Sequence, residues 1–241
     1  MERIPMGDYS NMAAYYDAIM TSGYYDYGAI IDDLPAGPTL RTGLEIGCGT
    51  GLLLEELVRR HPAVHLTGID LTEAMLAIAR QRLAAHPDVA LVQTDVVHMA
   101  LGRQFDMVFS YGGVWFFIDD GVNEPFLASH ITDDADNRAG LARTVQHLAD
   151  AGLLCLGIQG PNIDYSTVIR NGMIYSQRLE WHERGFVKHY DLVDGARTVM
   201  TQTLHLRTYS LAEATQLLTE SGLSARPRLT PDKKFMIFHR A

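Results

Sequence analysis

Three glycines at alternate positions, Gly47, Gly49 and Gly51, lie between a short apolar run and an apolar helical pattern. Glycine allows the chain to turn sharply and lets its backbone approach a ligand closely. The helix expected at 52–60 would point its free N–H groups toward that ligand. A strand, a glycine turn and a helix in this order predict an α/β fold with a nucleotide-like cofactor at the turn.

The segments beyond the glycine turn continue this alternation of strands and helices. Apolar runs predict strands at 44–46, 64–69, 90–93, 105–110, 153–159 and 235–239. Helical spacing of apolar residues predicts helices at 52–60, 73–84, 137–148 and 210–221. Such an alternation builds a mainly parallel sheet with helices on both faces.

Three tracts do not follow the alternation. Residues 10–34 have helical spacing with a break at Ser22 and Gly23, which predicts an N-terminal helical cap. Residues 115–136 are acidic and show no periodicity, so we expect a long loop there. Turn signals separate β-rich runs near 173–183, 186–193 and 196–208, which predict an antiparallel β insert. The expected organisation is a cap at 1–36, a core at 37–160 and 209–241, and an insert at 161–208.

The charge balance narrows the possible partners. The 241 residues include 20 Lys and Arg against 29 Asp and Glu, a net charge of −9. Nucleic acid is therefore not an expected partner, because binding it requires basic residues that neutralise phosphates. No apolar stretch approaches the roughly 18 residues of a membrane helix. Only two cysteines and no export signal favour a cytoplasmic protein, either a monomer or a homodimer.

Three carboxylates stand at the predicted ends of three consecutive strands. Glu45 precedes the first glycine by two positions, Asp70 ends the second strand and Asp95 follows the third. The loop reads G-x-G-x-G, not the G-x-G-x-x-G that seats a pyrophosphate, and Glu45 would repel such a group. Asp70 can accept both hydroxyls of a ribose, and Asp95 can accept an adenine amino group. The pattern favours a nucleoside cofactor with a cationic tail over a nicotinamide dinucleotide.

In this order the motifs resemble those of the class I S-adenosylmethionine-dependent methyltransferases, over roughly residues 44–159 and the final helix and strand. The resemblance implies a Rossmann-like seven-stranded methyltransferase sheet. It also implies S-adenosylmethionine as cofactor and S-adenosylhomocysteine as product. The cofactor-binding residues that it implies are Glu45, Gly47, Cys48, Gly49, Gly51, Asp70, Leu71, Met75, Thr94, Asp95, Val96 and Ser110.

The tyrosine-rich N-terminus and the insert are similar to a small-molecule branch of that family, which includes amino-sugar N-methyltransferases and glycine N-methyltransferase-like enzymes. This similarity implies that Tyr16 and Tyr27 touch the methionine end of the cofactor and that the insert covers the substrate. Alternatively, these tyrosines only pack the cap onto the sheet. The implied activity is methyl transfer to a nitrogen or oxygen of a small-molecule metabolite, with secondary-metabolite biosynthesis as one setting.

The sequence departs from other branches of the family after the fourth strand. Ser110, Tyr111, Gly112 and Gly113 stand where nucleic-acid amino-methyltransferases have a proline-containing tetrad. The aspartates that hold a metal in catechol-type enzymes are also missing, so no metal is expected. Two alternatives stay open: a methyltransferase-fold enzyme with a non-methylating reaction such as cyclisation, and a protein or RNA methyltransferase.

The acceptor is expected near the exit of the fourth strand. The substrate contacts predicted there and in the insert are Tyr111, Trp115, Phe116, Tyr175 and Arg178. The candidate catalytic residues are Tyr111, His130 and His182, with His189 and His205 as further candidates. An imidazole suits this role because its pKa lies near neutrality. Which face of the insert meets the substrate is left open by the sequence.

Overall fold

The central sheet has the seven strands that the motifs imply. The computed structural model describes residues 7–37, 40–224 and 227–241. The sheet runs β3-β2-β1-β4-β7-β13-β12, with β13 antiparallel to both of its neighbours. Its strands are β1 (Thr42–Ile46), β2 (His65–Asp70), β3 (Ala90–Gln93), β4 (Phe105–Ser110), β7 (Leu148–Gln159), β12 (Arg228–Leu229) and β13 (Phe235–His239). The expected Rossmann-like methyltransferase sheet is confirmed.

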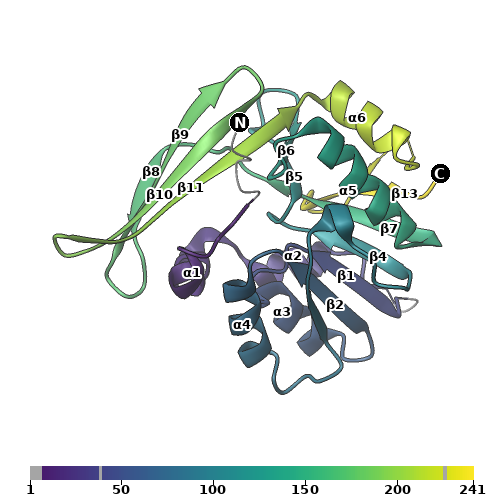
Figure 1. The fold of residues 1–241 in the computed structure, drawn as a ribbon, viewed down its shortest axis with the longest axis horizontal. Helices are drawn as coiled ribbons and strands as arrows, with labels where there is room; N and C mark the ends of the chain where they lie inside the picture. The colour runs from purple at the N-terminus through teal and green to yellow at the C-terminus, as the bar shows by residue number, and fades with distance from the viewer. Residues whose placement is uncertain (1–6, 38–39, 225–226) are drawn as a thin grey trace.

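Helices cover both faces of this sheet (Figure 1). They are α2 (Tyr27–Asp33), α3 (Leu52–Arg60), α4 (Glu73–Arg82), α5 (Asp134–Gln146) and α6 (Leu211–Glu220), with a short 3-10 turn η2 (Val96–His98). Side chains of β4 alternate between two cores, as the two-residue period of a strand requires. Val108 joins the core under α5 and α6, whereas Met107 and Phe109 join the core under α2, α3 and α4.

A second, mostly antiparallel sheet adjoins the central one and continues it through β7. Its order is β7-β5-β6-β11-β10-β9-β8. The added strands are β5 (Trp115–Ile118), β6 (Phe126–Ser129), β8 (Tyr165–Val168), β9 (Ile174–His182), β10 (Gly185–Asp194) and β11 (Arg197–Tyr209). Gly157 of β7 still pairs with Phe235 of the central sheet, and Ile158 pairs with Phe117 of the second. Figure 1 shows the long strands β9–β11, with the short β8 at their edge, projecting to one side of the molecule.

The prediction of a long loop at 115–136 is wrong. Residues 115–118 and 126–129 form the hairpin β5–β6, and α5 already begins at Asp134. The acidic residues that suggested a loop instead start a helix. The Asp133 carboxylate accepts hydrogen bonds from the backbone N–H groups of Ala135 and Asp136, and acidic residues in a first turn suit the helix dipole.

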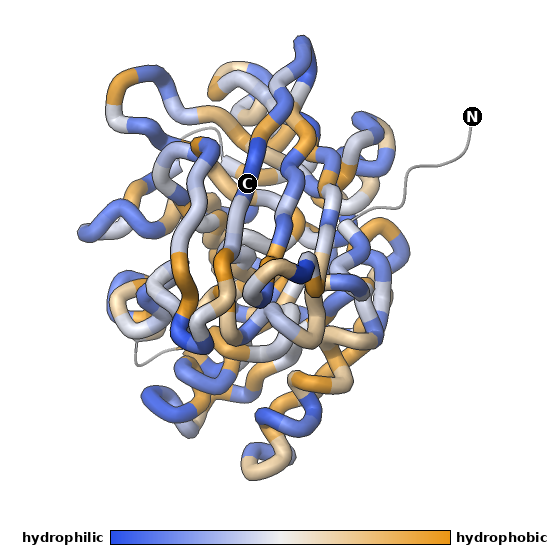
Figure 2. Tube along the Cα trace, turned by 90° about the vertical axis from the view of Figure 1, so that its left-hand side faces the viewer, coloured by the Kyte–Doolittle hydropathy of each residue, from blue (hydrophilic) through white to orange (hydrophobic). Residues whose placement is uncertain are grey.

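The N-terminal cap lies between the two sheets. It comprises α1 (Ala13–Ile19) and a π-helical turn η1 (Met20–Tyr24), which the non-helical backbone of Ser22 and Gly23 interrupts at the predicted break. Apolar residues of this cap share a core with the inner face of β9–β11. In Figure 2, which views the molecule from the side of that sheet, apolar and polar residues mix along its strands. None of the helices in the described residues is long and apolar enough to cross a membrane.

Asn137 connects the hairpin to α5 through four buried hydrogen bonds. Its Oδ1 accepts from Trp115 Nε1 at 2.8 Å and Ser129 Oγ at 2.7 Å. Its Nδ2 donates to the carbonyls of Ile131 at 2.8 Å and Asp133 at 2.9 Å. This amide uses its full hydrogen-bonding capacity inside the core.

We predict that Asn137→Ala lowers the free energy of unfolding by about 2 to 4 kcal/mol, because buried polar groups lose their partners. Urea denaturation followed by circular dichroism measures the change. Asn123→Ala, in the exposed turn of the β5–β6 hairpin, is the control and should change the free energy by less than about 0.5 kcal/mol. Equal effects of the two substitutions would contradict a structural role for the Asn137 network.

Candidate functional site

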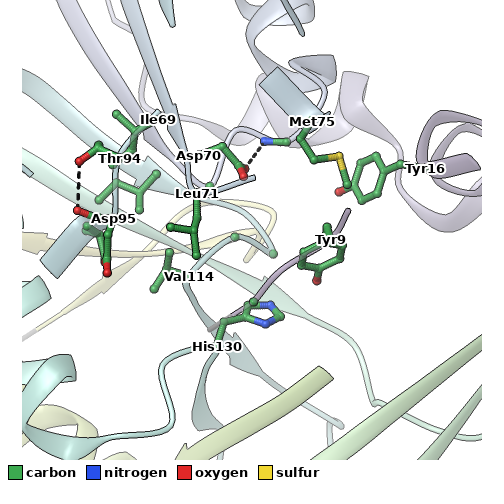
Figure 3. Close-up of a pocket in the computed structure, with 17 residues that line it drawn as sticks. Tyr9, Tyr16, Ile69, Asp70, Leu71, Met75, Thr94, Asp95, Val114 and His130 are labelled. Carbon is green, nitrogen blue, oxygen red and sulfur yellow. Dashed lines mark hydrogen bonds between the residues drawn. The ribbon is translucent and has the colours of Figure 1, made fainter. Parts of the chain in front are cut away.

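A cleft opens at the carboxyl ends of β1, β2 and β3, where parallel α/β sheets bind their ligands. It encloses about 660 Å³, open solvent at its mouth included. Its lining residues are Gly7, Tyr9, Tyr16, Ile46, Gly47, Gly49, Ile69, Asp70, Leu71, Met75, Thr94, Asp95, Val96, Gly112, Gly113, Val114 and His130. Figure 3 shows Asp70, Thr94 and Asp95 along one side, with Tyr9, Tyr16 and His130 across the cleft. We call this space the cofactor cleft.

The glycine turn forms the floor of the cofactor cleft. The N–H groups of Gly47 and Cys48 both donate to the Ile69 carbonyl at 2.9 Å, which ties the turn to β2. Gly47 has a φ of +73°, and a Cβ there would lie 2.8 Å from the Cα of Gly113. Only glycine fits this position, because both the conformation and the contact exclude a side chain. Gly51 adopts a φ of +79° at the start of α3 and lies outside the cleft.

Asp70 is fixed at the rim by two backbone hydrogen bonds. The Gly49 N–H donates to its Oδ2 at 2.8 Å, and the Thr72 N–H donates to its Oδ1 at 2.8 Å. Burial raises the pKa of this carboxyl, and these hydrogen bonds oppose the rise. Each oxygen keeps a lone pair for a further donor. The carboxylate can therefore accept a pair of hydroxyl groups in a fixed orientation.

The loop after β3 offers a second polar edge. The Asp95 carboxylate accepts from the Val97 N–H at 2.9 Å and so caps the short helix η2. Its Oδ2 lies 3.5 Å from His98 Nδ1. Val96 begins the helical turn and lines the cleft with Thr94. A carboxylate oxygen beside backbone groups at one edge of the cofactor cleft can accept a hydrogen bond from the amino group of a purine.

Glu45, two residues before the first glycine of the turn, is a buried carboxylate with an unsatisfied oxygen, and it is not among the residues that line the cofactor cleft. The residue is 4% exposed, and its Oε2 has no hydrogen-bond partner among the described residues. Burial, and then the charge of Asp70, raise the pKa of this carboxyl well above its usual value. A buried carboxylate without a partner is costly. A cation bound near Gly47 would relieve that cost, so the residue types here fit a cofactor with an ammonium group.

The cap covers the glycine turn with Tyr16. A Cβ added at Gly49 would lie 3.8 Å from the Tyr16 ring. The Thr50 hydroxyl donates to Asp17 Oδ1 at 2.6 Å, and Arg82 forms an ion pair with Asp17. These bonds attach α1 to the turn, so the cap is part of the site. Tyr27, the other tyrosine expected at the cofactor, lies outside the cleft lining and packs edge-on against Tyr25.

A smaller chamber adjoins the cofactor cleft. It encloses about 390 Å³, again with open solvent included. Its lining residues are Tyr9, Met12, Tyr16, Met20, Tyr24, Tyr25, Gly112, Phe116, His130, Gln159, Lys188, Tyr190 and Leu206. Tyr9, Tyr16, Gly112 and His130 line both spaces, so the two spaces are neighbours. We call this space the aromatic chamber.

His130 stands where the two spaces meet. It is 7% exposed, and its ring packs against Tyr9 and Phe116 with centroids 5.8 and 5.9 Å apart. Burial lowers the pKa of His130 to about 4, and the positive charge of Lys188 contributes to that shift. The imidazole is therefore neutral at physiological pH and can interact with an incoming ligand without adding charge.

The structure brings many of the expected site residues together. Those that line the cofactor cleft are Tyr16, Gly47, Gly49, Asp70, Leu71, Met75, Thr94, Asp95 and Val96. Cys48 and Ser110 are buried directly behind it, and the Ser110 hydroxyl has no partner among the described residues. On the acceptor side, Phe116 and His130 line the aromatic chamber.

Other predicted acceptor residues lie elsewhere. Trp115 is buried in the core, where its indole N–H donates to Asn137. It points to the opposite side of its strand from Phe116, because side chains alternate along a strand. Tyr111 packs between Tyr25 and Phe235, outside both spaces. Tyr175 is buried outside both spaces. Its ring stacks on the ring of Tyr190, which lines the chamber, with centroids 6.0 Å apart.

Arg178 and His182 are exposed and do not line either space. Along β9 they alternate with Tyr175 and Gln177, which are buried. The face of β9 that carries Tyr175 and Gln177 therefore points inward, whereas Trp181, further along the same face, is 55% exposed. His189 of β10 and His205 of β11 point to the outer face of the sheet. The residues on either side of them, which point inward, are buried: Lys188, Tyr190, Leu204 and Leu206.

Sequence reasoning missed Lys188, Gln159 and the tyrosines Tyr9, Tyr24 and Tyr25. A signal for Lys188 was present, because it alternates in phase with the apolar residues of its strand. Tyr9, Tyr24 and Tyr25 carried no periodicity that distinguished them from packing residues. Gln159 ends β7, where the chain passes from one sheet to the other, and no local pattern marks that position.

Comparison with known proteins agrees with this geometry. Residues 44–131 match the family described as a methyltransferase domain. Over 120 residues the chain is 40% identical to a trans-aconitate 2-methyltransferase of Acidovorax sp. (strain JS42), covering 49% of this chain and 38% of that one. Over 67 residues it is 34% identical to a malonyl-[acyl-carrier protein] O-methyltransferase of Priestia megaterium (strain DSM 319 / IMG 1521), covering 28% of this chain and 24% of that one. The chain thus matches about a quarter to two fifths of the length of these relatives.

Solved structures match nearly the whole chain. DesVI of Streptomyces venezuelae superposes with a TM-score of 0.71 at 22% identity, over 95% of this chain and 98% of its own. CalS10, an amino pentose methyltransferase from Micromonospora echinaspora, superposes with a TM-score of 0.69 at 23% identity, over 94% and 96% of the two chains. The protein has the class I methyltransferase fold. Its described cap and second sheet are included in the match, so the resemblance extends beyond the central sheet.

We predict that His130 reduces stability in acid. Its folded pKa of about 4 lies below the unfolded value of about 6.5, so the unfolded chain binds more protons between these values. As pH falls from 6.5 to 4, the wild-type free energy of unfolding should lose about 2 to 3 kcal/mol through this residue. His130→Gln should lack that component. Urea denaturation of both proteins at pH 7.5 and 4.5 measures it, and the same pH dependence in the two proteins would contradict the assignment.

Proposed function

We propose that the protein is an S-adenosylmethionine-dependent methyltransferase that methylates a nitrogen or oxygen atom of a small metabolite. One observation carries the proposal: a cleft edged by strand-end carboxylates shares lining residues with a small aromatic chamber. The cleft has groups for a nucleoside with a cationic tail. The chamber has aromatic and polar groups that would contact a small acceptor beside that tail.

The chain's own residues would hold the cofactor in a single orientation. Asp70 accepts the ribose hydroxyls, and Asp95 with the Val96 backbone holds the adenine. Glu45, whose Oε2 has no partner among the described residues, balances the charge of the methionine end. Tyr16 covers that end from the cap. When bound, S-adenosylmethionine supplies a methyl group that its positively charged sulfur already makes electrophilic.

The protein's contribution to the reaction would be alignment and exclusion of water. Tyr9, Tyr16 and His130 line both spaces. Burial raises the pKa of both phenols well above the usual value, so they stay protonated and uncharged. His130 is neutral above pH 4 and could accept a proton from the acceptor, but its low pKa makes it a weak base.

The relatives support a small acceptor. Trans-aconitate 2-methyltransferase and the amino pentose methyltransferase CalS10 are named for small-molecule substrates. The enclosed, aromatic form of the chamber favours a metabolite over a protein or RNA segment. The proposal includes a cytoplasmic location and a monomer or homodimer, with secondary-metabolite biosynthesis as one setting. Nitrogen or oxygen is left as the acceptor atom, because homologues of both kinds match the chain.

We predict that Asp70→Asn weakens binding of S-adenosylhomocysteine by roughly 10- to 100-fold, since a charge-assisted hydrogen bond is lost. The amide oxygen can still accept from the Gly49 N–H, but the amide nitrogen cannot accept from the Thr72 N–H, so circular dichroism must first show that the variant is folded. Isothermal titration calorimetry measures the change. Asp88→Asn, which removes an exposed carboxylate before β3, is the control and should bind normally. Unchanged affinity in a folded Asp70→Asn protein would remove Asp70 from the site.

Methyl transfer itself is tested with methyl-labelled S-adenosylmethionine and a small-metabolite extract of bacterial cells. The proposal expects label in a compound of low molecular mass. Label in protein or RNA would support the macromolecular alternative. Cofactor binding without any labelled product, while the extract yields an unlabelled cofactor-dependent product, would support a non-methylating reaction.

A further inference from the structure

Lys188 places a positive charge in the aromatic chamber. The residue is 4% exposed and lies on the inner face of β10. Its Nζ lies 3.4 Å from the Tyr24 hydroxyl and 5.4 Å from the centre of the Tyr190 ring. No salt bridge to a carboxylate is recorded for it within the described part of the chain. Its surroundings are thus aromatic and neutral.

A buried ammonium in such a place is unfavourable. Desolvation lowers the pKa of Lys188 to about 8, and no neighbouring carboxylate opposes the shift. Buried lysines are normally paired, because the cost of removing the charge from water is otherwise uncompensated. A hydrophobic residue would fill this face of β10 without that cost. The lysine therefore fits a ligand that supplies the missing negative charge.

A second hydrogen-bond donor in the chamber also needs an acceptor from a ligand. Gln159 Nε2 is buried and has no hydrogen-bond partner among the described residues. It lies 2.7 Å from the position that a Cβ on Gly112 would take, and both residues line the chamber. An ammonium and an amide N–H₂ both donate, so a ligand group that pairs with both must supply acceptor atoms, and a negative charge on it would pair with the ammonium. An ionised carboxylate has this property and a single charge that matches the single lysine.

We infer that the methyl acceptor carries a carboxylate, which forms an ion pair with Lys188 and accepts a hydrogen bond from Gln159. This inference rests on the proposed function, because it takes the aromatic chamber as the acceptor site. Lys188 is here a binding residue that fixes the orientation of the acceptor toward the cofactor cleft. The acceptor is thus a small acid, such as a hydroxy or amino acid, and a neutral sugar would leave the lysine unpaired.

The test compares carboxylates with their amides, which have nearly the same shape and no charge. Formate, acetate and benzoate, with formamide, acetamide and benzamide, are titrated into protein saturated with S-adenosylhomocysteine. Calorimetry or ligand-observed NMR measures the affinity. At pH 7 at least one carboxylate should bind 10-fold or more tightly than its amide. If no carboxylate of the three binds more tightly than its amide, the inference is overturned.

Substitution shows whether the preference comes from Lys188. Lys188→Met should abolish the preference for the carboxylate, because Met has a similar length and no charge. Lys233→Met removes the same charge from an exposed position and is the matched control, which should keep the preference. Retention of the full preference in a folded Lys188→Met protein would overturn the assignment.

The pH dependence of the wild-type protein provides a test that needs no variant. The other titratable groups of the chamber are His130 from the segment after β6, Tyr190 from β10, and Tyr9, Tyr16, Tyr24 and Tyr25 from the cap. Burial raises the pKa of every one of these tyrosines, and His130 titrates near 4. Lys188 is therefore the lining group that changes charge between pH 6 and 9. Carboxylate affinity should be constant from pH 6 to 7 and fall above about 8, toward 10-fold per unit, whereas a flat profile to pH 9.5 would contradict the inference.

Failure of this inference can be told from failure of the proposed function. Saturation with S-adenosylhomocysteine is measured first, in the same instrument. Protein that does not bind this molecule would contradict the cofactor assignment. Protein that binds it but shows equal affinity for carboxylates and amides would contradict the acceptor class alone.

Discussion

The close approach of two backbone segments, at Gly47 and Gly113, determines the arrangement of the site. A Cβ on Gly113 would lie 2.3 Å from the Ile46 carbonyl oxygen, and one on Gly47 would lie 2.8 Å from the Cα of Gly113. The contact places the start of β5 directly against the turn after β1. Because the second sheet continues from β5, the aromatic chamber necessarily adjoins the cofactor cleft. Two glycines thus join the two halves of the site with no side chain between them.

Charge is distributed unevenly over the two spaces. Asp70 places a carboxylate in the cofactor cleft and Glu45 is a second, buried carboxylate just before the glycine turn, whereas Lys188 places an ammonium in the chamber. Each of Glu45 and Lys188 is buried without a partner of opposite charge among the described residues, and such groups reduce stability. A fold tolerates them where ligands supply the compensating charges, and perturbed ionisation is a common mark of functional sites. The cap contributes the rest of the enclosure, since Asp17 fixes α1 to Thr50 of the turn.

Local patterns in the sequence predict the central sheet and the polar edge of the cofactor cleft. Strand β4, helix α3 and strand β13 begin and end at the predicted residues, because each element is short, apolar in its own period and bounded by turn residues. The hairpin β5–β6 was missed because its strands are four residues long and the acidic start of α5 was read as loop. Trp115 and Phe116 are neighbours in the sequence, but Trp115 points into the core and Phe116 points to the chamber. Only the pairing of β5 in a sheet shows which residue points which way.

The positions of the backbone turns and of the strand-end carboxylates can be predicted from the sequence, because they depend on residue types within a few positions of one another. The acceptor side depends on long-range contacts instead. In the sequence, Tyr9 is more than a hundred residues from Gln159 and Lys188. The three residues line one chamber because β7 leaves the central sheet and the cap inserts beneath β9–β11. Long-range packing sets those contacts and the burial that changes their charge states. No short segment of the chain contains that information, so the aromatic chamber can be recognised only in the three-dimensional structure.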